Sequence, residues 1–259
     1  MITQIVTTAM AGTRRAARQP GALVAVAGFY LVVTLALSAM WRAVTESRGG
    51  EIAGYDATSI TWYIIVSELA FSVVPQRLIE YTGDDVVNRR IVPELIRPAR
   101  PVVIRLAHEV GMVLPRLAAC AVVGVVFGFA VVGPPPSWSG LTLAIPALLL
   151  GAAGSIAAQH AFAAASFWFH ETRSAWFLYQ KLVFILGGLL IPIDVLPGPL
   201  RSVAAALPFA AFAYAPSRLA AGRIDPGWFV VQLGWLVALT IAAVVAFDRG
   251  TARLVREGS

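Results

Sequence analysis

Four polar side chains lie inside long apolar runs of this sequence, namely Glu68, Arg116, Gln159 and His160. Ionisable groups at such positions are costly in a membrane, so each is a candidate for function. Glu68 lies near the middle of its run, and Arg116 and His160 reach a similar depth in theirs. Together they predict a polar belt that lines a translocation path or locks two states. A buried Glu68–Arg116 ion pair that only holds helices together explains the same residues, and the sequence leaves both readings open.

Motifs for nucleotide or metal chemistry are absent from the sequence. It has no G-x-x-x-x-G-K-[ST] loop for ATP phosphates, no H-E-x-x-H, and no G-x-S-x-G. The cysteine Cys120 is single, and His108, His160 and His170 have no His or Cys partner at ligand spacing. We therefore expect the chain to bind no metal or cofactor itself and not to be an enzyme.

The composition predicts a membrane protein. Apolar residues make up 58% of the 259 residues and charged residues only 13%, against about 25% charged in a soluble domain. The net charge of +6 comes from basic residues that lie between and beside the apolar runs, without interleaved aromatic residues. That pattern indicates membrane topology and contact with anionic lipid, and it excludes nucleic-acid binding.

Six segments are apolar enough to cross a bilayer, which takes about 20 residues of helix. They are Gly21–Trp41, Thr58–Ile79, Val110–Val132, Leu141–Phe169, Trp176–Ile191 and Gly227–Phe247. The prediction is an all-α membrane protein with six transmembrane helices, in one permease domain over residues 1–259. Arginines gather before the first span, between the second and third, and after the last. We therefore expect a multi-pass protein of the bacterial inner (plasma) membrane with both termini in the cytoplasm.

Two cytoplasmic segments outside the spans have recognisable patterns. In residues 1–20, apolar residues recur at helical spacing from Ile2 to Met10, which predicts an amphipathic helix in the membrane interface; a frayed tail is the alternative. In residues 80–105, Gly83–Asp85 predicts a helix start, and the prolines that follow predict an elbow. This loop either docks into a partner protein or only fixes topology.

The external segment 192–226 is too apolar for an ordinary loop and is interrupted by Pro208 and Pro216. We expect two short re-entrant helices that pack on the bundle, because irregular backbone at membrane depth must be covered. No internal repeat is visible, which disfavours an inverted-repeat carrier. Gly124 and Gly128 form a G-x-x-x-G pattern that permits close helix packing within the chain or at a dimer seam.

These segments resemble the ABC-2 type transporter permease family. The resemblance is carried by GDDVVNRRIVPELIRPARP between the second and third spans, and by the GGLLIP…LP…LPF…P…G skeleton from Gly187 to Gly222. The N-terminal helix and the six spans agree with it, so that it covers nearly the whole chain. It implies the fold of a type V ABC exporter, a second permease copy or sister permease, and separate ATPase subunits that hold ATP and Mg²⁺.

The resemblance also assigns roles to residues. The coupling segment that inserts into the ATPase would comprise Asp84, Asp85, Val86, Arg89, Arg90, Pro93, Glu94, Leu95 and Arg97. The external gate would comprise Gly187, Gly188, Pro192, Pro197 and Pro208. We therefore expect an ATP-driven exporter of a hydrophobic or amphiphilic cargo. The alternatives are a proton-coupled carrier using Glu68, Arg116 and His160, and an intramembrane enzyme acting on lipid.

Overall fold

The computed structural model describes residues 2–95, 100–169 and 173–257, which form helices joined by loops. Within them, four long helices are apolar enough to cross a membrane. They are α2 (Pro20–Ser47), α6 (Pro101–Val131), α7 (Trp138–Ala163, extended by the 3₁₀ turn η1, Ala164–Phe167) and α12 (Gly227–Glu257). The all-helical prediction is confirmed, and these helices contain four of the six predicted spans.

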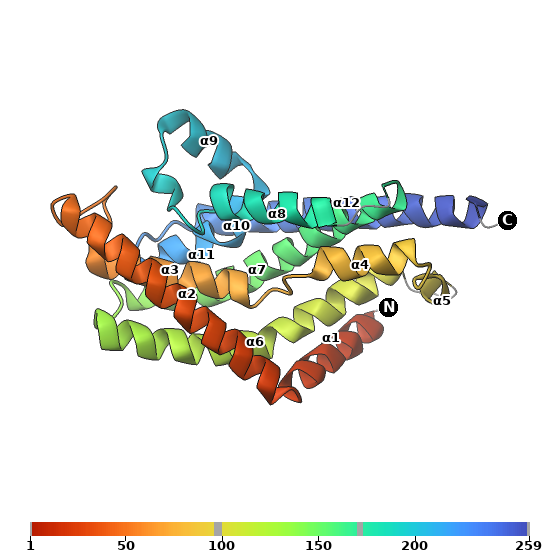
Figure 1. Ribbon diagram of the computed structural model, residues 1–259, viewed down its shortest axis with the longest axis horizontal. Helices are drawn as coiled ribbons and strands as arrows, with labels where there is room; N and C mark the ends of the chain where they lie inside the picture. The colour runs from red at the N-terminus through yellow and green to blue at the C-terminus, as the bar shows by residue number, and fades with distance from the viewer. Residues whose placement is uncertain (1, 96–99, 170–172, 258–259) are drawn as a thin grey trace.

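The remaining elements are shorter. They are α1 (Ile2–Ala17), α3 (Ala57–Ser72), α4 (Leu78–Val87), α5 (Val92–Leu95), α8 (Arg173–Leu186), the 3₁₀ turn η2 (Ile193–Val195), α9 (Gly198–Ala206), α10 (Pro208–Phe212) and α11 (Tyr214–Ala220). Figure 1 places both chain ends toward the end of the molecule that carries α4 and α5, with α9 toward the other end. This arrangement agrees with an even number of crossings.

The second predicted span is not one continuous helix. Thr58–Ile79 is divided between α3 and α4, with a break that contains Pro75. Proline lacks the N–H that continues a helix, and its ring clashes with the preceding turn. The fifth predicted span is also shorter than expected, since α8 has 14 residues and ends before Gly187. Neither α3 nor α8 alone has the length of about 20 residues that crosses a bilayer.

Helix α3 forms the centre of the bundle, with 13 of its 16 residues buried. Its first turn is closed by a capping box, in which the Asp56 carboxylate accepts from the Ser59 N–H at 2.7 Å. The Ser59 hydroxyl accepts in return from the Asp56 N–H at 2.9 Å. The Ser59 N–H and the Ser59 hydroxyl both donate to the Asp56 carboxylate, and these two hydrogen bonds hold the pKa of Asp56 below its usual value. The start of this buried helix is therefore determined by its local sequence.

The G-x-x-x-G pattern of α6 is used inside the chain. A Cβ atom on Gly124 would overlap the Tyr30 hydroxyl of α2, and one on Gly128 would lie 2.8 Å from the Trp62 ring of α3. The two glycines therefore admit the large aromatic side chains of two neighbouring helices. Of the two uses that the sequence allowed, the structure shows packing within one chain.

Helix α1 packs with one face against α6 and leaves its apolar stripe exposed. Gly12 and Gly111 each face the backbone of the opposite helix, and the Thr13 hydroxyl donates to the Gly111 carbonyl at 2.8 Å. On the outer side Ile2 and Met10 are 78% and 52% exposed. The N-terminal helix thus forms as predicted, and its exposed apolar side chains are available to lipid.

Candidate functional site

The four polar candidates of the apolar runs do not form one belt. Glu68 on α3 is 2% exposed, and no hydrogen bond to its Oε1 atom is found among the described residues. No ion pair joins it to Arg116 in that part of the chain. Arg116 lies half-buried on α6. The sequence predicted two charges at similar depth, but helix rotation decides whether they face each other.

Gln159 and His160 follow each other on α7 and line different cavities. Successive residues of a helix point about 100° apart because 3.6 residues make one turn. Gln159 lines a cavity beside α8, and His160 lines a second cavity bounded by α1, α4, α5 and α6. His160 is fully buried and packs edge-on against Phe247 of α12, with ring centroids 6.1 Å apart.

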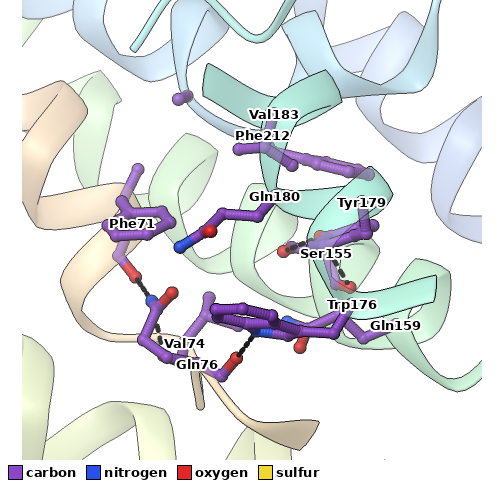
Figure 2. Close-up of a pocket in the computed structure, with 12 residues that line it drawn as sticks. Phe71, Val74, Gln76, Ser155, Gln159, Trp176, Tyr179, Gln180, Val183 and Phe212 are labelled. Atoms are coloured by element: carbon purple, nitrogen blue, oxygen red, sulfur yellow. Dashed lines mark hydrogen bonds between the residues drawn. The ribbon is translucent and has the colours of Figure 1, made fainter. Parts of the chain in front are cut away.

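The cavity beside α8 is a small space between α7, α8 and the break that separates α3 from α4 (Figure 2). Trp176 donates its indole N–H to the Gln76 carbonyl at 2.7 Å, and the Ser155 and Tyr179 hydroxyls lie 2.7 Å apart. Figure 2 shows the Gln180 side chain extending toward Phe71 across the cavity. The space has a volume of about 20 Å³, which holds roughly one water. In this conformation the cavity is too small for a transported molecule.

The predicted coupling segment is anchored to the rest of the protein by side chains on its inner side. Val86 and Ile91 are buried in a cluster that includes Phe167 and Phe247. Arg105 of α6 donates to both Glu94 carboxylate oxygens at 2.7 and 2.9 Å, and its Nη2 lies 2.9 Å from the Asp85 carboxylate. A two-point arginine–carboxylate pair fixes direction as well as distance. Arg105 therefore ties both α4 and α5 to the start of α6.

The outer side of the same segment is exposed and basic. Arg89, Arg90 and Pro93 are exposed, as are the neighbouring Val87 and Val92. Arg89 has a positive φ of 56°, a conformation that costs a non-glycine residue about 1–3 kcal/mol. The predicted coupling segment thus divides into anchors on one side and an exposed surface on the other, which is Val87–Pro93 without the buried Ile91.

One detail of the predicted coupling segment was wrong. Gly83–Asp85 is not a helix start, because α4 already begins at Leu78, directly after the break at Pro75. Gly83 is buried within α4, whose first turn carries the acidic Glu80. Leu95 is the last residue of α5, and Arg97 lies outside the described residues.

The predicted gate residues lie at a turn of the backbone and at the starts of short helices. Gly188 has a φ of 74°, and its carbonyl accepts from the Tyr63 hydroxyl at 2.6 Å. The Gly187 carbonyl accepts from the Tyr214 N–H at 3.1 Å. The prolines stand at the starts of three successive short helices, where a missing N–H costs nothing: Pro192 before η2, Pro197 before α9 and Pro208 at the first position of α10.

The main polar cluster on the predicted external side, near α9, is centred on Asp194, which sequence reasoning missed. Its side chain is 5% exposed and accepts from the Tyr55 hydroxyl at 2.7 Å and the Tyr214 hydroxyl at 3.0 Å. Arg201 and Arg223 lie 2.9 and 3.4 Å from its two oxygens. We call these five residues the external latch. The available signal was a single acid within the apolar run IPIDVLP.

A third cavity is an apolar groove between α3, α6 and α7. Its volume is about 290 Å³. The walls carry only apolar and aromatic side chains, among them Trp62, Leu69, Leu114 and Leu148. Such a groove accepts hydrocarbon and offers no partner for a charged group.

The comparisons with known proteins agree with this architecture. A family model described as ABC-2 family transporter protein matches residues 31–258, from within α2 through α12. No curated protein matches the sequence closely enough to be compared with it. The match spans most of the chain and confirms the resemblance that its segments carry, and the four long apolar helices are those of a multi-pass membrane protein. The chain therefore belongs to the ABC-2 family of transporter proteins.

Proposed function

We propose that this chain is the permease subunit of an ATP-driven exporter, in which separate ATPase subunits bind ATP and Mg²⁺ and hydrolyse the nucleotide. The observation that carries the proposal is the two-sided coupling segment. Its exposed surface Val87–Pro93 lies toward the end of the molecule where both termini lie, and its inner side is tied to α6. Membership of the family supports the transport role. The exposed surface is where we expect the ATPase to bind.

Arg105 explains how such a segment transmits force. It connects Asp85 on α4 and Glu94 on α5 to a 31-residue helix that is long enough to cross the membrane. A displacement of the segment by a bound ATPase would therefore move α6 as well. Since α6 also lines the apolar groove, this movement would change the shape of the groove.

The cargo and membrane arrangement form part of the same proposal. The apolar groove favours a hydrophobic or amphiphilic cargo. We infer that α3 with α4 supplies one further crossing and α8 another, which gives six, and that η2 to α11 form the re-entrant external gate. The permease would act in the bacterial inner membrane with cytoplasmic termini, paired with a second copy or a sister permease.

Purification in mild detergent from the native membrane tests the ATPase partnership. We expect a protein with a phosphate-binding G-x-x-x-x-G-K-[ST] loop to co-purify. The double variant Arg89→Glu/Arg90→Glu should retain at most about a tenth of it, because reversing interface charges costs several kcal/mol and about 1.4 kcal/mol is tenfold in affinity. Arg249→Glu, another exposed arginine of the same end, is the control. Equal ATPase recovery from the double variant would exclude this surface as the docking site.

A proton-coupled carrier is the second candidate, favoured by Glu68, whose buried Oε1 atom has no hydrogen-bond partner among the described residues. Transport in inverted vesicles separates the two functions, since the exporter needs ATP and the carrier needs a proton gradient. With the exporter, we expect Glu68→Gln to lower ATP-driven transport several-fold while expression stays normal, because the isosteric amide preserves packing. If expression falls as much as transport, Glu68 is a structural residue only.

A further inference from the structure

A polar cavity lies at the inner side of the coupling segment and has no role in the account above. It is enclosed by α1, α4, α5, α6 and α7 and has a volume of about 300 Å³. That is the lower end of the size range of small-molecule sites, which is about 300–1,000 Å³. The wall residues that matter here are Arg15, Thr82, Arg105, His108, Glu109 and His160.

Two of these side chains are fully buried and lack partners within the described residues. Neither ring nitrogen of His160 makes a hydrogen bond there, and the Thr82 hydroxyl makes none either. Buried polar groups are almost always hydrogen-bonded, so each such exception needs an explanation. A neutral imidazole offers one donor and one acceptor, and a hydroxyl offers both as well. Both residues line the cavity, and their unused donors and acceptors carry no charge. Because these atoms are buried, a ligand reaches them only when the surrounding side chains move slightly.

The charged groups of the wall largely balance one another. Arg105 is held by Glu94 and Asp85, and the Glu109 carboxylate lies 3.5 Å from His108 Nδ1. A phosphate in this space would approach the carboxylates of Glu94 and Glu109. A quaternary ammonium would approach the guanidinium groups of Arg15 and Arg105. An uncharged ligand is repelled neither by the carboxylates nor by the guanidinium groups.

We propose that this cavity binds an uncharged, hydroxyl-rich group such as a sugar ring, with His160 and Thr82 as its hydrogen-bonding partners. The ligand is either a free sugar or the head group of an amphiphile. The inference rests on the proposed exporter function in one respect: there the cavity would receive the polar part of the cargo. Because α4 and α5 form part of the wall, docking of an ATPase would alter the site.

Cysteine protection tests the inference in the full chain, reconstituted in nanodiscs. Cys120 is first replaced by alanine, and Thr8→Cys then reports from the cavity wall on α1. Thr7→Cys, on the same helix but not among the cavity-lining residues, is the matched control. The probes are methyl glucoside, octyl glucoside below its micelle-forming concentration, and octyl phosphate. Labelling by N-ethylmaleimide is followed in time.

A saturating glucoside should slow labelling of Thr8→Cys about tenfold, as for nine-tenths occupancy, and leave Thr7→Cys unchanged. Protection by both glucosides identifies a free sugar as sufficient; protection by octyl glucoside alone identifies an amphiphile. His160→Phe should abolish the protection, and His160→Gln should retain it because the amide keeps a donor and an acceptor. If His160→Phe does not fold, Thr82→Val, which removes only the hydroxyl, should weaken it instead.

The inference is overturned if neither glucoside protects, if Thr7→Cys is slowed equally, or if octyl phosphate protects at lower concentration. These measurements need no ATPase, so they fail independently of the exporter proposal. Absence of protection in a permease that does co-purify with an ATPase overturns the cavity site alone. Protection in a permease without any ATPase partner leaves the site standing and overturns the exporter.

Discussion

Asp194→Ala is expected to loosen the predicted external side of the protein and to lower its free energy of unfolding by about 1–3 kcal/mol, the cost of leaving buried hydroxyl donors without an acceptor. The substitution leaves the Arg201 and Arg223 guanidinium groups and the Tyr55 and Tyr214 hydroxyls without their common acceptor. Burial and the Asp194 carboxylate raise the pKa of Tyr55, so its hydroxyl stays protonated as the donor.

The size of this effect follows from what the external latch connects. Tyr55 lies in the α2–α3 loop, Arg201 on α9, Tyr214 on α11, and Arg223 just before α12. One carboxylate therefore joins four segments, of which the loop that carries Tyr55 is 139 residues away in sequence. Asp194→Asn should cost less than Asp194→Ala, because the amide oxygen still accepts a hydrogen bond although the charge is lost.

Thermal unfolding in detergent measures the loss, and Asp225→Ala is its matched control. Asp225 pairs with Arg218 at 3.4 Å and is 48% exposed, so its removal should cost less than about 1 kcal/mol. Labelling of Ser202→Cys, on the exposed α9, should also become faster in Asp194→Ala as the helix detaches. Equal melting temperatures for Asp194→Ala and Asp225→Ala would refute the latch.

Gly111→Val is expected to separate α1 from α6. A Cβ atom at Gly111 would overlap the backbone carbonyl of Ala9, which cannot move aside as a flexible side chain could. Overpacking usually costs about 1–3 kcal/mol, and here the Thr13–Gly111 hydrogen bond of 2.8 Å is lost as well. The α1–α6 contact also forms part of the polar cavity, through Thr8 and Arg15.

Limited trypsin digestion detects this separation. Arg14, Arg15 and Arg18 are exposed, but the ordered helix that α1 forms on α6 resists cleavage, and this protection is lost when α1 leaves α6 and unfolds. We expect rapid loss of the N-terminal segment from Gly111→Val and slow loss from the unmodified chain. Gly28→Val is the control: it places the same side chain on membrane helix α2, where nothing lies within 4 Å of the new Cβ atom. Identical digestion of the two variants would show that the close α1–α6 packing is not required.

Much of the fold was predictable, because membrane insertion depends on local composition. An uncharged run such as Gly21–Trp41 must satisfy its backbone hydrogen bonds internally, and a helix is the available solution. The same reasoning places the amphipathic helix over residues 2–17 and the short proline-started helices after Pro192. The break at Pro75 also had a local cause, but the apolar character of Thr58–Ile79 concealed it.

The sequence by itself determined the membrane class, four long apolar helices and the family, because each depends on neighbouring residues or on motifs. Only the tertiary structure decided which polar groups meet. It left Glu68 without Arg116, collected four side chains around Asp194, and turned Val86 inward and Arg89 outward. The physical reason is that these outcomes depend on helix rotation and on contacts between distant segments, which a single sequence does not encode in its local pattern.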